Sequence, residues 1–393
     1  MKRILISLIL AVILGGAAIA QDVSIREDSP DEYIVVEGDT LWDISGRFLD
    51  EPWQWPAIWH ANQQIENPHL IYPGDRISLV YIDGQPRLMV DRGRPTVRLS
   101  PETRVTSRQP IPPISHDRIR GLIRNFRHIG SQEELDALPY VVANAEQRYQ
   151  AVVMDNTYVR NLEGEVGEYF AVMRLANIYF RKKGEIRRAV EPGYGQHAPT
   201  SREWHPTWWE RAGNLNPQNY GDIVGFELVQ VAEGMLVKNG DPAIVTIGSS
   251  QDAVKEGDFL VPLNDPGYVD QYYPSAMDTV PEGMRVLAVQ GDNRLVGHLK
   301  MVSITGGSLQ GVQPGHVFST FRPGDKIRDE VKYPAGSLAD AGTWKGDHVV
   351  LPDEWGGHIM VFRVFDEVSY ALVMQGERPV REFDVLRHPS ETL

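Results

Sequence analysis

The sequence predicts an α+β fold, in which a small strand–helix–helix–strand unit precedes a mainly antiparallel β region, sandwich-like or barrel-like, with a few short helices. Two observations predict it. Residues 33–79 change from strand-like to helical apolar spacing and back again. From residue 80 onward short apolar runs dominate, and turn signals such as Asn239-Gly240-Asp241 and Gly306-Gly307-Ser308 separate them.

Residues 1–20 have the pattern of a signal peptide. Lys2 and Arg3 precede an apolar run at residues 4–14, and Ala18-Ile19-Ala20 is the small-x-small motif that a signal peptidase cleaves. The alternative is an uncleaved membrane anchor, but the run is shorter than the ~20 apolar residues that a bilayer span needs. We therefore expect an exported protein that begins at Gln21 and has no membrane span.

The composition argues against several classes of protein. The 393 residues include 39 Lys and Arg against 53 Asp and Glu, for a formal charge of −14. This balance argues against a general role on nucleic acid, and against simple electrostatic adhesion to an anionic cell wall. The sequence has no cysteine, hence no disulfide, no lipid-modified cysteine and no thiolate nucleophile.

A strand and a capped helix open the first unit. Tyr33-Ile34-Val35-Val36 predicts the strand, and Glu37-Gly38-Asp39 turns the chain. Thr40 is placed to cap the helix, and Asp43 three residues later completes a capping box. The core face of this helix follows from helical spacing, and consists of Leu41, Ile44 and Phe48.

A second helix and a strand complete the unit. Trp55-Pro56 places proline in the first helical turn, where its missing N–H is tolerated. We expect Ile58 and Ala61 to face inward. The turn Tyr72-Pro73-Gly74-Asp75 then leads into a strand at residues 76–80.

These residues resemble the LysM family. Tyr-x-Val-x-x-Gly-Asp-Thr-Leu-Trp-Asp-Ile from Tyr33, Ile-Trp-x-x-Asn from Ile58 and Asn-Pro-x-Leu-Ile-x-Pro-Gly-x-x-Ile from Asn67 are similar to its consensus. For residues 31–80 the resemblance implies a βααβ domain that binds N-acetylglucosamine-containing glycans, mainly peptidoglycan, without a cofactor. The binding positions of the family correspond here to Gly38, Asp39, Thr40, Leu41, Pro68, His69, Leu70, Ile71 and Tyr72.

The chemistry of these positions suits a sugar chain. An acetamide needs hydrogen-bond donors and acceptors, whereas the methyl group and the ring face need apolar contact. Exposed backbone beside Leu70, Ile71 and Tyr72 offers both. Three aromatic side chains have two interpretations, as sugar platforms or as packing of the small domain, and their size favours packing. They are Trp42, Trp53 and Trp59.

The rest of the chain is expected to form a linker and β-rich middle region at residues 81–220 and a β-rich C-terminal domain at residues 221–393. Two helices are predicted in the middle region. One spans residues 115–126, and the other starts at Ser131, which forms a capping box with Glu134.

Two weaker patterns have simple explanations. Residues 254–261, 312–318 and 380–386 share a hydrophobic residue, a tight turn and a strand, which generic hairpin chemistry explains better than a true repeat. The basic run at residues 181–188 would bind wall phosphates or form a charged hairpin tip around Gly184, and the hairpin is the simpler interpretation.

A wall hydrolase is the main alternative for the whole protein. The sequence has no His-x-His, His-Glu-x-x-His, Gly-x-Ser-x-Gly or phosphate-loop motif, and His197 and His205 lack metal-ligand spacing. A pair of glycosidase carboxylates has no motif and stays open, although muramidase-like domains are mostly helical. We expect no catalytic residue and no metal site.

Three later segments resemble a second family, in this order along the chain: residues 138–145, 221–247 and 361–374. Together with the signal peptide and the LysM-like unit, they are similar to the type IV pilus secretin-associated protein family, whose C-terminal part is similar to the C-terminal domain of flagellar assembly protein T. The resemblance implies a non-catalytic periplasmic adaptor that ties an outer-membrane secretin to peptidoglycan. A flagellar basal-body structural protein is the alternative.

Overall fold

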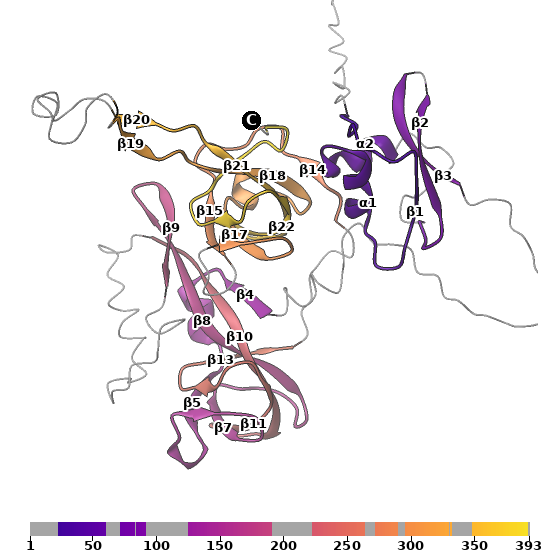
Figure 1. Cartoon of the computed structure of the whole chain (residues 1–393). Coiled ribbons are helices and arrows are strands. Elements are labelled where there is room, and N and C mark those ends of the chain that lie inside the picture. Colours follow the sequence, from indigo (N-terminus) through magenta and orange to yellow (C-terminus); the bar gives the residue numbers. More distant parts are fainter. Residues whose placement is uncertain are drawn as a thin grey trace, which may run out of the picture.

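The computed structural model of the chain describes residues 23–59, 71–82, 84–91, 125–190, 222–263, 272–289, 295–329, 331 and 348–391. Three units follow one another along the chain, from indigo to yellow in Figure 1. The first contains helices and a small sheet, and the other two are built almost entirely from antiparallel strands. The predicted α+β class is confirmed.

The N-terminal unit is a three-stranded antiparallel sheet, in the order β1-β2-β3, with its helices between β1 and β2. Its elements are β1 (Glu32–Ile34), α1 (Leu41–Phe48), the 3₁₀ turn η1 (Pro52–Gln54), α2 (Trp55–Trp59), β2 (Arg76–Ile82) and β3 (Gln85–Asp91). Strand β3 was not predicted. It pairs with β2 along its whole length, and Leu88 is fully buried in the core of the unit.

The caps of this unit form as predicted. The Thr40 hydroxyl oxygen accepts a hydrogen bond from the Asp43 N–H at 3.1 Å and its O–H donates to the Asp43 carboxylate at 2.7 Å. Helix α1 therefore begins at Leu41, and its buried face includes Ile44 and Phe48.

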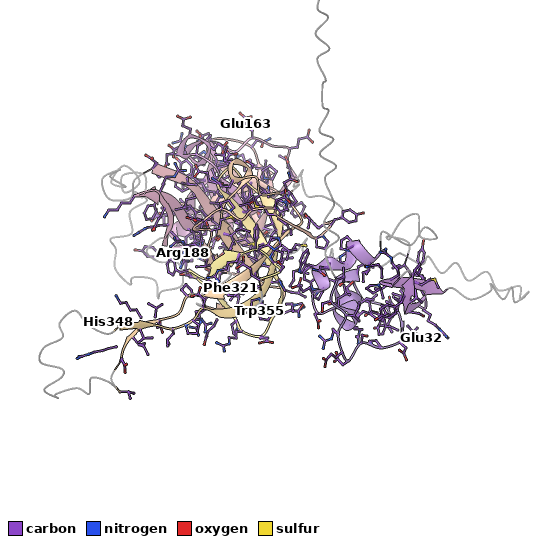
Figure 2. The ribbon with its side chains drawn as sticks, turned by 90° about the horizontal axis from the view of Figure 1, so that it is seen from above. Glu32, Glu163, Arg188, Phe321, His348 and Trp355 are labelled. Atoms are coloured by element: carbon purple, nitrogen blue, oxygen red, sulfur yellow. The ribbon has the colours of Figure 1, made fainter. Side chains whose placement is uncertain are left out.

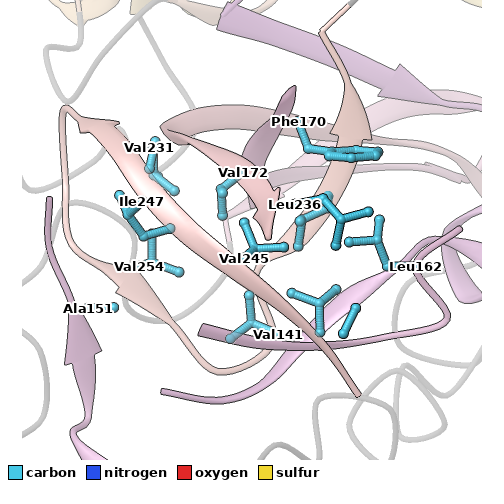
Figure 3. Packing of buried hydrophobic residues seen from close by; sticks show 14 residues of the cluster. Val141, Ala151, Leu162, Phe170, Val172, Val231, Leu236, Val245, Ile247 and Val254 are labelled. Atoms are coloured by element: carbon cyan, nitrogen blue, oxygen red, sulfur yellow. The ribbon is translucent and has the colours of Figure 1, made fainter. Parts of the chain in front are cut away.

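The second unit is a closed barrel. An eight-stranded sheet runs β4-β10-β11-β7-β5-β13-β8-β9, and an additional pairing of β10 with β8 closes the ring. Apolar side chains fill it, and Figure 3 shows Phe170, Val172, Leu236 and Val245 gathered in its interior. Its elements are β4 (Phe126–Ile129), α4 (Gln132–Ala137), β5 (Tyr140–Asn144), η2 (Ala145–Gln147), β6 (Gln150–Ala151), β7 (Asn156–Arg160), β8 (Tyr169–Lys182), β9 (Glu185–Val190), β10 (Asp222–Lys238), β11 (Ala243–Ser250), β12 (Val254–Lys255) and β13 (Phe259–Pro262).

The pairing of β10 explains why this unit extends past the boundary expected at residues 220 and 221. Strand β10 lies between β8 before that point and β11 after it, and a strand signal in the sequence does not reveal its partners. The helix expected from Ser131 is confirmed as α4, with the Ser131 hydroxyl accepting the Glu134 N–H at 3.2 Å. Most of the helix expected at 115–126 lies outside the described residues, and its last residue, Phe126, starts β4.

The third unit is a second barrel. Its sheet runs β14-β18-β21-β22-β17-β15, and β24 pairs with β18. Hydrogen bonds from Val286 N–H to the Asp384 carbonyl and from Leu386 N–H to the Met284 carbonyl, both 2.9 Å, join β15 to β24 and close the ring. Its elements are β14 (Ser275–Ala276), β15 (Val286–Val289), β16 (Leu295–Val296), β17 (Met301–Thr305), η3 (Ser308–Gln310), β18 (His316–Arg322), β19 (Lys326–Arg328), β20 (His348–Val350), β21 (Glu354–Val364), β22 (Val368–Gly376), β23 (Val380–Arg381) and β24 (Val385–Arg387).

The basic run at residues 181–188 joins the two barrels. It forms the β8–β9 hairpin, whose tip at Gly184 has a φ of +82°, so the hairpin interpretation is confirmed. Arg181 forms an ion pair with Glu367, and Arg188, labelled in Figure 2, forms one with Glu382. Both carboxylates belong to the second barrel, so these arginines have protein partners.

A buried polar network lies at the same junction. The Glu227 carboxylate on β10 accepts hydrogen bonds from the Tyr179 O–H at 2.8 Å and from Asn177 Nδ2 at 2.5 Å. The Tyr179 hydroxyl also bonds Ser303 of the second barrel at 2.8 Å. Burial raises the pKa of Glu227, although these hydrogen bonds work in the opposite direction.

Candidate functional site

Two turns of the N-terminal unit lie side by side. The Val35 N–H donates to the Asp75 carbonyl at 2.9 Å, and the Gly74 N–H donates to the Val35 carbonyl at 2.7 Å. The turn at residues 72–75 is thereby fixed against the end of β1, immediately before the turn at residues 36–39. The structure thus brings the predicted positions Gly38 and Asp39 close to the turn that begins at the predicted position Tyr72.

The first turn is held by Asp39. Its N–H donates to the Val36 carbonyl at 3.2 Å, and its carboxylate accepts the Val36 N–H at 2.8 Å and the Tyr33 O–H at 2.9 Å. Gly38 has a φ of +94°, which glycine adopts without a steric penalty. Asp39 therefore fixes the conformation of the turn, and the backbone of Gly38 is exposed to solvent.

Tyr33 stabilises the first turn through its hydrogen bond to Asp39. The Arg47 guanidinium lies 4.4 Å from the centre of its ring. Burial, together with the hydrogen bond to Asp39, raises the pKa of Tyr33, so the phenol stays a neutral donor at neutral pH. The contribution of Tyr33 to the site was not predicted from the sequence.

The second turn has the same hydrogen bonds as the first. The Asp75 carboxylate accepts the Tyr72 N–H at 3.1 Å, and the Asp75 N–H donates to the Tyr72 carbonyl at 3.0 Å. Gly74 has a φ of +95°. The Gly-Asp dipeptide that occurs at both turns is the signal that would have identified Asp75 from the sequence.

The predicted site residues have different surroundings. Thr40, Leu41 and Ile71 are buried and support the turns from inside, whereas Gly38 is exposed. Asp39 and Tyr72 are half-buried at the surface. The remaining positions, Pro68, His69 and Leu70, lie outside the described residues.

Two of the tryptophans pack between units. Trp42 and Trp53 are each 3% exposed and belong to an apolar cluster with residues of the second barrel, including Val317 and Met360. The Trp55 ring centre lies 6.1 Å from that of Tyr273. The packing interpretation therefore holds, with the second barrel as the partner, and the side chain of Trp59 lies outside the described residues.

Within the part of the chain that the structure describes, no three His, Asp or Glu side chains gather closely enough to hold a metal ion. His197 and His205 lie outside that part. Among the helices of the described ranges, none has the length and apolar character needed to span a bilayer.

Comparison with known proteins identifies the N-terminal unit. Residues 33–80 match the LysM domain family. The uncharacterized protein YqbP of Bacillus subtilis (strain 168) is 33% identical over 63 residues, which are 14% of this chain and 29% of that protein. The chain thus spans less than a third of that relative's length. Residues 33–80 are a LysM domain, a non-catalytic binding module whose presence suggests peptidoglycan binding.

Proposed function

We propose that this protein is an exported, non-catalytic adaptor that binds the glycan strands of peptidoglycan through residues 38–41 and 68–72. One observation carries the proposal: the backbone bonds of Val35 hold the turn at 36–39 beside the turn at 72–75, in a domain that matches LysM. Two fixed turns of exposed backbone offer the acetamide of N-acetylglucosamine both donors and acceptors.

The side chains fit the apolar part of the same sugar. Tyr72 is half-buried at the edge of its turn, where its ring is able to contact a sugar face, and Gly38 has no side chain to obstruct the approach. Because the Asp39 and Asp75 carboxylates are engaged in their own turns, we expect neutral hydrogen bonding to dominate recognition.

Sedimentation with purified peptidoglycan tests the site. Tyr72→Ala should weaken sedimentation about tenfold, the loss of one good contact. The matched control is Tyr81→Ala, because Tyr81 lies on β2 of the same domain and is 64% exposed. Equal binding by the two variants would place the glycan elsewhere, and clearing of peptidoglycan in a zymogram would establish a hydrolase in place of an adaptor.

We propose further that the two barrels contact an outer-membrane secretin, so that the LysM domain ties the pore to the wall. The support is the resemblance of residues 138–145, 221–247 and 361–374 to secretin-associated proteins. These segments include the whole of β5 and β10 and parts of β11, β21 and β22. Crosslinking in cells should trap a secretin. Recovery of flagellar basal-body proteins would favour a flagellar role.

A further inference from the structure

The connection between β5 and β7 ends in a turn of uncommon composition. The Asp155 N–H donates to the Val152 carbonyl at 3.0 Å, and the Asp155 carboxylate accepts the Val152 N–H at 3.0 Å. Met154, directly before the aspartate, has a φ of +74°. Four other turns in the described residues have the same Asp bond: three place glycine at this position, Gly38, Gly74 and Gly257, and the fourth places Phe383, at a φ of +71°.

Large apolar side chains are exposed around this turn. Tyr149 is 76% exposed, Val152 52%, Val153 46% and Met154 78%. A left-handed backbone conformation is strained for methionine, and adjacent exposed apolar side chains usually mark a binding surface. The cluster of adjacent exposed apolar side chains therefore points to a role for the tip in binding.

The barrel holds this tip rigidly. The Met154 N–H donates to the Ile247 carbonyl at 2.8 Å, and the Ile247 N–H donates to the Asp155 carbonyl at 2.9 Å. Just before the turn, Ala151 pairs with Val254, and both side chains are buried in the barrel (Figure 3). The apolar side chains are therefore presented on a fixed support.

The small apolar area of the tip limits the kinds of partner that it can bind. Four side chains offer at most a few hundred Å², whereas a stable protein interface buries about 800 Å² per partner. A small convex apolar tip is suited to the polar–apolar boundary of a bilayer. Arg148 forms ion pairs with Glu146 and Asp155, so the local charges are largely compensated and attraction would be apolar.

We propose that the exposed side chains of the tip, Tyr149, Val152, Val153 and Met154, insert into the surface of a phospholipid membrane. The tip lies at the end of the first barrel beyond β5 and β7, at the bottom of Figure 1, whereas the LysM domain lies beside the second barrel at the upper right. A chain bound to glycan at one end would thus contact lipid at the other. This inference does not depend on glycan binding.

Vesicle flotation tests the proposal. The chain from Gln21 onward, which lacks the apolar N-terminal run, is mixed with vesicles of phosphatidylethanolamine and a minority of phosphatidylglycerol. It should float with them, with little dependence on salt. Val153→Ser with Met154→Ser should reduce flotation at least about tenfold, because two apolar side chains are lost. The matched control, Val350→Ser, alters a 64% exposed valine on β20 and should float normally.

A second variant separates binding from folding. Met154→Gly relieves the backbone strain, so it should melt at a higher temperature and still float less than the wild type. Wild-type protein that fails to float, a double variant that floats as well as wild type, or flotation abolished by salt would each overturn the proposal. Sedimentation with peptidoglycan should be unchanged in every variant, which separates this test from that of the glycan site.

Discussion

A buried ion pair between Arg174 and Asp258 stabilises the first barrel, and replacing Arg174 tests its contribution. Its Nε and Nη2 donate to the two Asp258 carboxylate oxygens, each at 2.8 Å, and Nη1 donates to Asp252 at 2.6 Å. The Arg174 side chain is 10% exposed and that of Asp258 is 4% exposed. Because the Asp258 carboxylate also accepts the Lys255 N–H at 2.7 Å, one buried cation fixes the turn that leads into β13.

Replacing Arg174 with methionine leaves Asp258 buried without its cation. Loss of one partner from a buried ion pair costs about 3–5 kcal/mol of unfolding free energy. Arg160 and Asp241 have the same two-bond geometry, at 3.1 and 2.9 Å, but are 47% and 53% exposed. Water screens that pair, so Arg160→Met should shift the unfolding midpoint far less than Arg174→Met.

The assay is unfolding in guanidinium chloride, with transition midpoints compared among wild type, Arg174→Met and Arg160→Met. A multidomain chain need not unfold in one step, so the comparison uses the transition that Arg174→Met shifts. Adding Asp258→Leu to Arg174→Met should recover part of the loss, because no unpaired charge then remains buried. If the two single variants shift the midpoint equally, burial does not set the strength of this pair.

Three further predictions concern other parts of the chain. Burial, and secondarily the nearby Arg363, lowers the pKa of His128 to about 4. The unfolded state, with a pKa of about 6.5, therefore binds the proton first, and stability should fall by about 3 kcal/mol as pH drops from about 6.5 to about 4; His128→Phe should flatten the acid side of a melting-temperature profile. Thr40→Ala removes the cap of α1 and should cost about 1 kcal/mol in calorimetry, whereas Thr40→Ser should restore most of it. Trp53→Ala should cost about 3 kcal/mol and loosen the LysM domain from the second barrel, measured as faster protease release of that domain; an unchanged cleavage pattern would contradict the packing role.

The features that were predicted correctly depend on residues close to one another in the sequence. Thr40 caps α1 through a residue three positions away, and Ser131 caps α4 in the same way, so each cap is visible in a few letters. Gly38 and Gly74 mark turns because only the local backbone matters there. These short-range rules were enough to predict both caps and both turns.

The features that were missed depend on distant partners. Strand β3 has a weak strand signal because Pro86 lies near its start, and it is stabilised by pairing with β2 and by burial of Leu88. Trp53 was expected to pack within its own domain, but the second barrel, which is built from residues far along the chain, covers it. No local pattern encodes such a contact.

One turn pattern recurs in both barrels: an aspartate carboxylate accepts the N–H of the residue three positions before it. In the first barrel the Lys255 N–H donates to the Asp258 carboxylate at 2.7 Å, and in the second barrel the Arg381 N–H donates to the Asp384 carboxylate at 2.8 Å. Each turn follows a two-residue strand, β12 or β23, and precedes a barrel strand, β13 or β24. Generic turn chemistry accounts for this much.

Both turns also make a pair of backbone bonds to a neighbouring strand. The Asp258 carbonyl accepts the Val141 N–H at 2.8 Å, and the Asp384 carbonyl accepts the Val286 N–H at 2.9 Å. In both barrels the residue before the aspartate donates back to the carbonyl of that same valine. The LysM domain has the same pair of bonds between Val35 and the turn at Asp75, and the first barrel has it again between Ile247 and the turn at Asp155. Because the pair recurs outside the two matching segments, it belongs to this type of turn, and generic turn chemistry remains the better explanation of the similar segments.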